Sequence, residues 1–408
     1  MTLCRINSQT IDPDDESFRP LLENAWTQRL RPFCLCRPDG VEMYLVRFEQ
    51  RILIKRMPDS GSNHASDCEH FEAPASLSGL GDVLGKAIEE REDGSAIFKL
   101  GFSLSRSGAH LAPTPGGEPS DTVSAEPNKL SLRSLLHYLW HEAGLHRWTP
   151  AFEGKRHWRQ VHARLSAAGA AMIAKKAPLS DRLYIPEPFR IDQATEIEAR
   201  RRAYIARFRP ERTDRRDLVL VVGELKSIDP SRYGYRLTLK HMADVPLYAS
   251  ADTVKRLNKR FVVEFEIAAN VEDVHLMTIA TVSINHAGQA SLEDASLMLV
   301  DENWLPFEDI DERDLIAELT RTGRSFVKGL RFNVQNWPLA NLLLTDLSPA
   351  IAMYILPAAI SDENRIVIDE MIADNRIGHW IWETDQGPWP VIPLKNNPLR
   401  IGHVPAGE

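Results

Sequence analysis

Alternation of apolar and polar side chains organises the N-terminal part of the chain. Residues 41–48 (VEMYLVRF) and 51–57 (RILIKRM) both alternate in this way around a short break at 49–50. This period of two predicts a β-hairpin. Upstream, apolar residues between Phe18 and Leu30 follow an acidic stretch at helical spacing and predict a short amphipathic helix.

The middle of the chain changes to a helical period. Leucines at helical spacing predict a helix over 129–148 that ends near Gly144. A second helix is expected over 153–176, followed by a strand in LSDRLYIPEPF. This order resembles a winged helix-turn-helix unit in outline. The alternative is a small helical subdomain with a solvated basic face.

From Leu218 onward, apolar strands with short breaks alternate with a few helices and predict an antiparallel or mixed sheet. We expect Trp380, Trp382 and Trp389 near the C-terminus to pack in a core or a domain interface rather than to stack on bases.

The expected fold class is therefore α+β, with a zinc-clipped β-hairpin module, a helical, winged-helix-like middle and a C-terminal sheet domain. The expected boundaries are residues 1–106, a linker at 107–128 that is rich in Pro, Gly, Ser and acids, 129–190, and 191–408. The last domain would be a degenerate nuclease-like fold.

Composition narrows the class of protein. A chain of 408 residues with 43% hydrophobic residues is long enough for two or three domains. Its net charge of −8 argues against non-specific coating of nucleic acid, although a local basic patch can still bind phosphate. Four cysteines make no disulfide framework, and neither a leader nor a membrane-spanning run is visible, so we expect a cytoplasmic protein without a membrane partner.

Three of the four cysteines flank the predicted hairpin. Cys34 and Cys36 precede it, and His64 and Cys68 follow it, so the hairpin brings the two pairs together. Thiolate and imidazole are the ligands that zinc prefers, and four of them leave no open position. The pattern predicts a structural zinc site, with His70 as the alternative fourth ligand. The alternative interpretation is that these cysteines are buried or surface thiols that bind no metal.

Two basic segments are candidates for nucleic-acid binding. The second helix carries Lys155, Arg156 and Arg159, and the run that follows contains Arg201, Arg202 and Arg207. Clustered guanidinium groups bind phosphate well. Acidic residues lie among the arginines of the second segment, so an internally paired, solvated face is the alternative.

A divalent-metal nuclease is the enzymatic alternative. Glu224 and Lys226, at the end of an apolar strand, match half of a PD-(D/E)xK motif, in which carboxylates bind Mg²⁺. Asp346 ends another strand, but the strand that follows it offers no acid. We expect a solvent-facing charged pair at Glu224 and Lys226, and a strand terminus at Asp346.

Histidines on the first helix invite a second metal hypothesis. His137 and His141 are four residues apart, with Glu142 and His146 following. In the metalloprotease motif the acid lies between the two histidines, so this order does not match. We expect these histidines to be core or surface residues.

Several sequence blocks together resemble the bacterial domain-of-unknown-function family numbered 1173. They are CLCRPDGVEMYLVRF, KRMPDSGSNHASDC, LLHYLWHEAGLHRW with EGKRHW, DRLYIPEPF, FVKGLRF and LLLTDLSPAIAMYIL. The resemblance covers about residues 30 to 390. It implies a bacterial protein carried on integrative and conjugative elements. It supports the set Cys34, Cys36, His64 and Cys68, and transfers no catalytic residue.

The function that we expect is a zinc-stabilised, DNA-associated accessory protein of a bacterial mobile genetic element without catalytic activity. One alternative is the metal-dependent nuclease, which alone would require Mg²⁺. The other is a scaffold that binds a protein partner from the same element.

Overall fold

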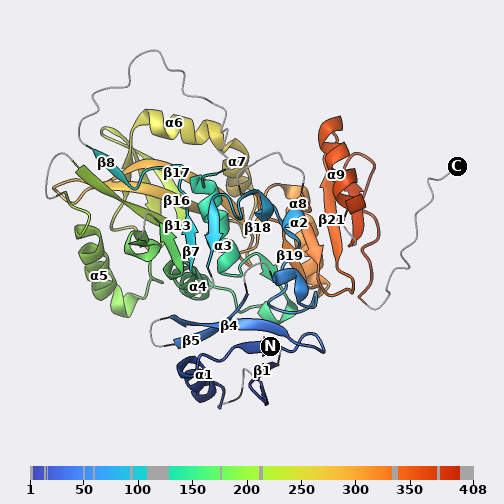
Figure 1. Cartoon of the computed structure of the whole chain (residues 1–408). Coiled ribbons are helices and arrows are strands. Elements are labelled where there is room, and N and C mark those ends of the chain that lie inside the picture. The colour runs from blue at the N-terminus through green and yellow to red at the C-terminus, as the bar shows by residue number, and fades with distance from the viewer. Residues whose placement is uncertain are drawn as a thin grey trace.

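The computed structural model describes residues 3–12, 15, 17–48, 51–57, 60–91, 95–107, 128–174, 177–210, 215–332, 339–374 and 377–395 (Figure 1). The predicted linker at 107–128 falls almost wholly outside these residues. The described part contains helices and mixed sheets, which confirms the α+β class. None of its helices combines the length and the apolar character that crossing a bilayer requires.

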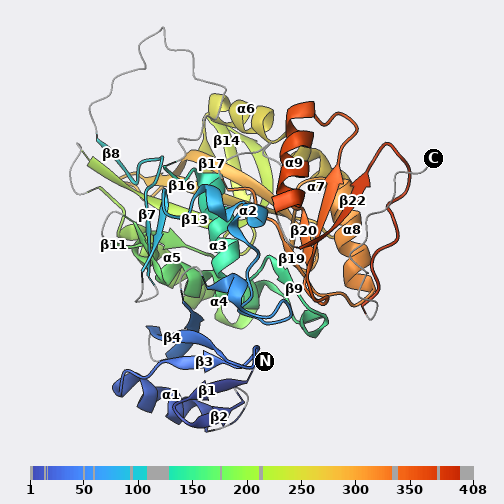
Figure 2. The ribbon, with the colours of Figure 1, turned by 45° about the vertical axis from the view of Figure 1, so that its right-hand side comes forward.

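The N-terminal module is a sheet with strand order β2-β1-β3-β4-β5 (Figure 2). Its strands are β1 (Cys4–Ile6), β2 (Gln9–Ile11), β3 (Pro32–Cys34), β4 (Val41–Phe48) and β5 (Arg51–Arg56). The predicted hairpin is confirmed, because β4 pairs antiparallel with β5 from Met43↔Arg56 to Phe48↔Arg51. The predicted first helix is α1 (Phe18–Thr27), whose Leu22 and Ala25 pack with Ile6 and Ile52.

The largest sheet has the order β12-β13-β14-β15-β17-β16, with β13 also pairing with β16. Its strands are β12 (Leu183–Tyr184), β13 (Arg215–Ser231), β14 (Gly234–Leu239), β15 (Leu247–Ala249), β16 (His275–Ile284) and β17 (Ala290–Val300). The short strands β8 (Ser105–Ser107) and β18 (Pro306–Phe307) pair with β13 and β17. This sheet has apolar cores on both faces, since Val219 and Val221 lie in one cluster and Leu220 and Val222 in another.

Helices cover both faces of this sheet (Figure 1). On one face, α3 (Leu132–Glu142) contacts β16 and β17 and buries Leu135 and Leu136. Ser131 caps α3 by accepting a hydrogen bond from the backbone of Ser134, as capping residues do. On the other face, α6 (Ala251–Arg260) and α7 (Val262–Asn270) bury apolar residues in the opposite core.

The rest of the helical middle is joined to sheets as well. Helix α4 (Trp158–Ala170) follows β9 (Arg147–Trp148), and α5 (Ala194–Ala206) follows later. A small sheet of order β11-β10-β7-β6 lies beside them, formed by β6 (Ile88–Glu90), β7 (Ala96–Phe98), β10 (Met172–Ala174) and β11 (Ala177–Pro178). Since α3 is buried against the largest sheet, only the outer face of α4 is accessible in this helix pair.

The C-terminal sheet has the order β22-β21-β20-β19-β9. Its other strands are β19 (Phe326–Lys328), β20 (Leu342–Leu344), β21 (Ile351–Leu356) and β22 (Gly378–Glu383), and it is accompanied by α8 (Ile310–Arg321) and α9 (Asp362–Asp374). A short helix, α2 (Ala75–Ser78), lies earlier in the chain. Trp380 and Trp382 are buried and Trp389 packs against the same core, which confirms their structural role.

An ion pair is buried between α8 and the C-terminal sheet. Lys328 Nζ lies 3.0 Å from Glu312 Oε1, and both side chains are almost fully buried. Asn341 Nδ2 also donates to Glu312, at 2.9 Å. Because burial raises the pKa of Glu312, its negative charge depends on these two partners and on the backbone N–H of Glu308, which donates to it at 2.7 Å.

We predict that Lys328→Met lowers the free energy of unfolding by about 3–5 kcal/mol, because it leaves the Glu312 carboxylate buried without a cation. Urea denaturation followed by circular dichroism measures the change. Arg321→Ala is the matched control, since its ion pair with Glu318 lies at the surface, and no measurable change is expected. Equal stabilities for the two variants would contradict the prediction.

Candidate metal centre

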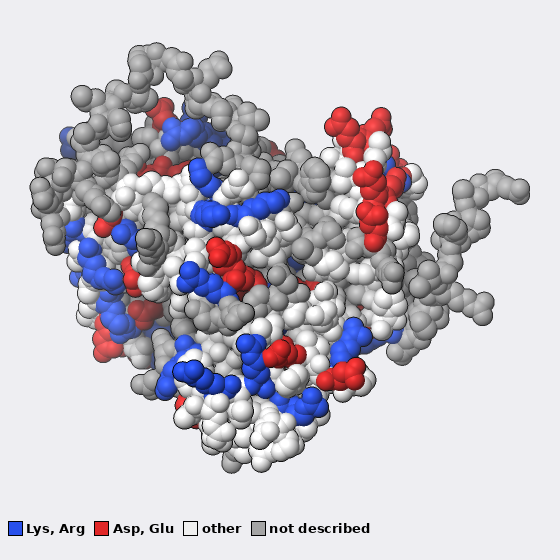
Figure 3. All heavy atoms as spheres, in the orientation of Figure 1, with Lys and Arg blue, Asp and Glu red and all other residues white. Residues whose placement is uncertain are grey.

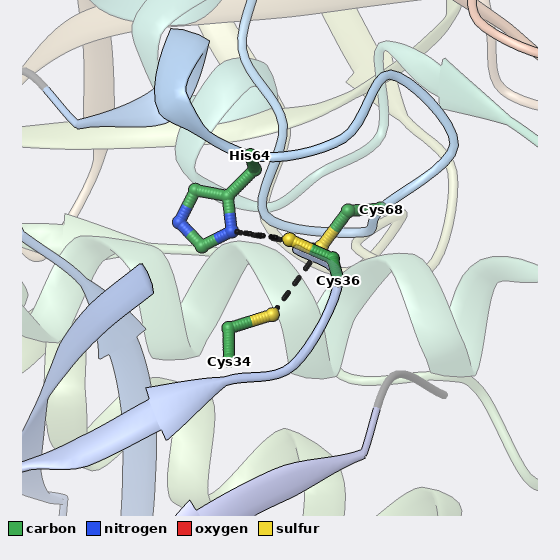
Figure 4. Close-up of side chains that lie close together, drawn as sticks. All are labelled: Cys34, Cys36, His64 and Cys68. Atoms are coloured by element: carbon green, nitrogen blue, oxygen red, sulfur yellow. Dashed lines mark hydrogen bonds between the residues drawn. The ribbon is translucent and has the colours of Figure 1, made fainter. Parts of the chain in front are cut away.

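Four side chains from the end of β3, from the turn that follows it and from the loop after β5 lie close together (Figure 4). Cys34 is the last residue of β3 and Cys36 lies in the turn that leads to β4. His64 ends a short 3₁₀ turn after β5, and Cys68 follows it in the same loop. The β4–β5 hairpin therefore brings the two pairs together.

The distances among these ligand atoms fit one tetrahedral ion. Cys34 Sγ lies 3.6 Å from Cys68 Sγ, and His64 Nδ1 lies 3.4 Å from Cys36 Sγ and 3.7 Å from Cys68 Sγ. All four ligand atoms lie within 4.8 Å of one another. Zinc–sulfur bonds of about 2.3 Å and zinc–nitrogen bonds of about 2.0 Å imply separations of about 3.5–3.8 Å. These four residues can hold a metal ion.

The surroundings enclose the four ligands. Cys34, His64 and Cys68 are buried, and Cys36 is partly buried. The backbone N–H groups of Ala65 and His70 donate to the sulfurs of Cys36 and Cys68, each at 3.4 Å. Such hydrogen bonds stabilise thiolate ligands. With four protein ligands, the site has no open position for a substrate.

The alternative fourth ligand, His70, lies outside this set. Its ring centroid is 5.6 Å from that of His64, and its Nε2 atom is 3.9 Å from Glu69. The ring of His70 lines a neighbouring cavity instead. The geometry therefore favours His64 over His70.

The thiols are poorly suited to exist as thiolates without a cation. The contact with Cys68 and burial raise the pKa of the Cys34 thiol, and burial raises that of Cys36. The remaining cysteine, Cys4, is opposite Cys34 in the neighbouring strand, and burial raises its pKa to about 11. A bound dication would offset these penalties at the sulfurs of Cys34 and Cys36.

Residues 61–72, which carry His64 and Cys68 and are called the metal loop below, also pack against the C-terminal sheet together with Cys34. Cys34, Cys68 and Phe71 share an apolar cluster with residues of β19, β20 and β21, among them Leu343 and Tyr354. The hydroxyl of Ser66 donates to the carbonyl of Leu347 at 2.9 Å. The four ligands thus lie where the N-terminal module meets the rest of the chain.

Comparison with known proteins assigns the family. The family described as "Protein of unknown function (DUF1173)" matches residues 4–385, which is nearly the whole chain. The chain belongs to this family. No curated protein and no solved structure matches the chain significantly. The DUF1173 match thus includes the four clustered ligands and every sheet described above.

The three carboxylate and lysine candidates for a nuclease site lie in two different sheets. Glu224 belongs to β13, where it is 5% exposed, with Lys240 Nζ at 2.5 Å and His275 Nδ1 at 2.9 Å. Lys226 is exposed on the same strand. The expectation that both residues face solvent was therefore wrong for Glu224, because a cation and an imidazole stabilise its carboxylate inside the protein.

Asp346 follows β20 in the C-terminal sheet. Both of its carboxylate oxygens accept hydrogen bonds from Arg324, each at 2.8 Å, and one also accepts from the backbone of Ser325 at 3.0 Å. These hydrogen bonds hold the end of β20 in place, as expected for Asp346 as a residue at which a strand ends. Asp346 and His64 both line a cavity of about 770 Å³, so the turn after β20 adjoins the metal loop.

The predicted nucleic-acid-binding residues divide into two groups. Arg156 is held by the carbonyls of Leu145, Arg147 and Asn303, and Arg201 is buried in an ion pair with Asp244. These two arginines hold the fold together.

The other four candidates are exposed. Lys155 lies in the turn before α4 and Arg159 on the outer side of α4, whereas Arg202 lies on the outer side of α5 and Arg207 directly after that helix. Arg202 pairs with Glu198 at 3.0 Å, and Arg207 stacks on Tyr204. The internal pairing expected as an alternative for this run is therefore present at Arg202.

A second charged cluster lies beside the metal loop and was missed in the sequence. His141 Nε2, on α3, lies 2.7 Å from Glu72 Oε1, and Arg56 lies 2.5 Å from the other oxygen of Glu72. His141 Nδ1 is 3.5 Å from Glu142, which also faces Lys55 at 3.5 Å. The sequence indicates only His141 and Glu142, because neither Glu72 nor Arg56 belongs to a recognisable motif.

The side chains of this cluster have strongly shifted pKa values. Burial opposes the charge on His141, but Glu72 and Glu142 raise its pKa to about 9. Burial also opposes the charge on Glu72, yet His141 and Arg56 lower its pKa to about 2. The histidine is therefore a cation at neutral pH and links the N-terminal module to α3.

We predict that stability falls at alkaline pH because of His141. Its pKa rises from 6.5 to about 9 on folding, so its contribution is complete below pH 6.5 and disappears as the pH rises through 9. Thermal unfolding between pH 6 and pH 10 measures this decline. His141→Gln should be less stable at pH 7 and should show a weaker decline, and parallel pH profiles for both proteins would contradict the assignment.

Proposed function

We propose that this protein is a zinc-stabilised, DNA-associated accessory protein of a bacterial mobile genetic element, without catalytic activity of its own. The observation that carries the proposal is the closed set of three thiols and one imidazole at the junction of the N-terminal module. Zinc is the metal whose ligand preferences and geometry this set matches best. The mobile-element context rests only on what the family resemblance implies.

A basic surface supports the DNA part of the proposal. We define the hairpin–helix surface as the β13–β14 turn and the outer face of α6, with Arg232, Tyr233, Lys255, Arg256 and Lys259 exposed. The turn lies beside the start of α6, because β14 pairs with β15, which leads directly into that helix. Basic side chains gather over α6 in Figure 3.

The turn adds an aromatic ring to the charges. Tyr233 is 83% exposed, and the guanidinium of Arg232 lies over its ring at 5.1 Å. A solvent-exposed ring beside cations is the arrangement with which proteins stack on unpaired bases. The hairpin–helix surface therefore suits a nucleic acid better than the paired arginines of α5 do.

The charge distribution favours one orientation. Acidic side chains line α9, among them Asp362, Glu363, Asp369, Glu370 and Asp374, and they form a separate ridge in Figure 3. A polyanion is repelled by this ridge and attracted to α6. This separation allows local DNA binding by a chain of net charge −8.

We predict one zinc per chain. Elemental analysis of freshly purified protein should find stoichiometric zinc, which Cys36→Ser should lose together with thermal stability, because structural zinc contributes directly to folding. Cys4→Ala is the matched control: it changes a buried cysteine opposite Cys34 but outside the ligand set, and it should keep its zinc. Metal-free wild-type protein with unchanged stability would contradict the proposal.

We also predict salt-dependent DNA binding through the hairpin–helix surface. In fluorescence anisotropy titrations at several salt concentrations, the double variant K255Q/R256Q should reduce the slope of log K against log salt by about 2, since two phosphate contacts are lost. Tyr233→Ala should weaken single-strand binding by about 1–3 kcal/mol and leave duplex binding nearly unchanged.

Arg190→Gln combined with Arg321→Gln serves as the control for charge alone. Both arginines are exposed and paired with a neighbouring acid, and they lie outside the hairpin–helix surface. This control should bind DNA as the wild type does. If no DNA binding is seen at micromolar protein, or if both double variants lose affinity equally, the proposed surface is wrong.

A further inference from the structure

A polar cavity of about 200 Å³ lies between the N-terminal module and α3. The module contributes Lys55 and Arg56 from β5 and Glu72 from the loop after the metal ligands. The chain beyond the N-terminal sheet and its loop contributes Glu90 of β6 and Arg91, His141 and Glu142 of α3, and His146 and Arg147. Cavities at the junction of two structural units are common places for ligands.

The charges around this cavity do not balance. The cationic groups are Lys55, Arg56, Arg91, His141 and Arg147, and the carboxylates are Glu69, Glu72, Glu90 and Glu142. Three of the cations surround Glu72 and Glu142. Arg147 donates to the carbonyls of Phe71 and Cys68, and within the described residues neither Arg147 nor Arg91 forms an ion pair.

Two buried imidazoles provide unused hydrogen-bonding atoms. His146 is 4% exposed, and its ring stacks on that of His141 with the centroids 4.7 Å apart. Among the described residues, His146 Nδ1 has no hydrogen-bond partner, and His141 Nδ1 has only the distant Glu142 carboxylate. Buried polar atoms without partners are rare, so a group that bonds to them is expected.

Burial opposes the ionisation of two groups in the wall of the cavity. Burial raises the pKa of Glu90, whose nearest described partner is the hydroxyl of Tyr138 at 3.5 Å. Burial also lowers the pKa of His146 well below its ordinary value. A site that holds a neutral imidazole and one more cation than carboxylates has an electrostatic preference for an anion.

We propose that this cavity binds a single small oxyanion group, a phosphate or a carboxylate, between Arg91, Arg147 and the His141–His146 pair. A monoanion brings the surrounding charge to balance and accepts hydrogen bonds from guanidinium and imidazole groups, which match oxyanions well. The cavity of about 200 Å³ has room for such a group. The group belongs either to a free small molecule or to the terminal phosphate of a nucleic acid.

Isothermal titration calorimetry of the zinc-loaded full chain with inorganic phosphate tests the proposal. A one-site isotherm is expected. Arg91→Gln removes an exposed cation at the rim and should weaken binding about fivefold, whereas Glu90→Gln removes a repelling carboxylate and should tighten it by a similar factor. Arg190→Gln, in an exposed ion pair on another surface, is the control and should leave the affinity unchanged.

Further titrations separate the two sources of the group. The titrants are acetate, a 5′-phosphorylated dinucleotide and, as its matched control, the same dinucleotide with a 5′-hydroxyl. Tighter binding of the phosphorylated dinucleotide than of free phosphate assigns the site to a nucleic-acid end. Binding of phosphate or acetate without this gain assigns it to a free small molecule. No saturable heat from any of these anions, or equal affinities for the Arg91 and Glu90 variants, would overturn the proposal.

Discussion

The junction between the metal loop and the C-terminal sheet is the constraint on which the arrangement of this protein depends. The N-terminal sheet is small, and only a few apolar residues pack between it and α1. Its loops reach the rest of the chain through Cys34, Cys68 and Phe71, which pack beside Leu343 and Tyr354. A bound ion would fix the conformation of these loops and so preserve the surface that packs against the C-terminal sheet.

A second set of contacts at the same junction is ionic rather than apolar. His141 lies between Glu72 of the module and Glu142 of α3, and Arg56 and Lys55 complete the group. Breaking a buried ion pair is costly because the remaining charge is left without a partner. The same charges line the cavity between the two units, so docking of the module and the character of the cavity have one physical origin.

Charge is also separated on a larger scale. The acidic helix α9 and the basic helix α6 occupy different parts of the surface, although the net charge of the chain is negative (Figure 3). Some of the arginines in the basic segments of the sequence bond to groups within the protein, as Arg156 and Arg201 do. Arginine density along a chain does not show which guanidinium groups find a carbonyl or a carboxylate inside.

By itself, the sequence determined the elements whose signal is local. The alternation over 41–57 predicted the hairpin, the leucines predicted α3, and the spacing around the hairpin predicted the set Cys34, Cys36, His64 and Cys68. Each depends on residues that are close in the chain or are joined by one tight turn. The tertiary structure alone decided that α3 packs against one face of the largest sheet and that Glu72 contacts His141, since both require contacts between distant segments that no local period encodes.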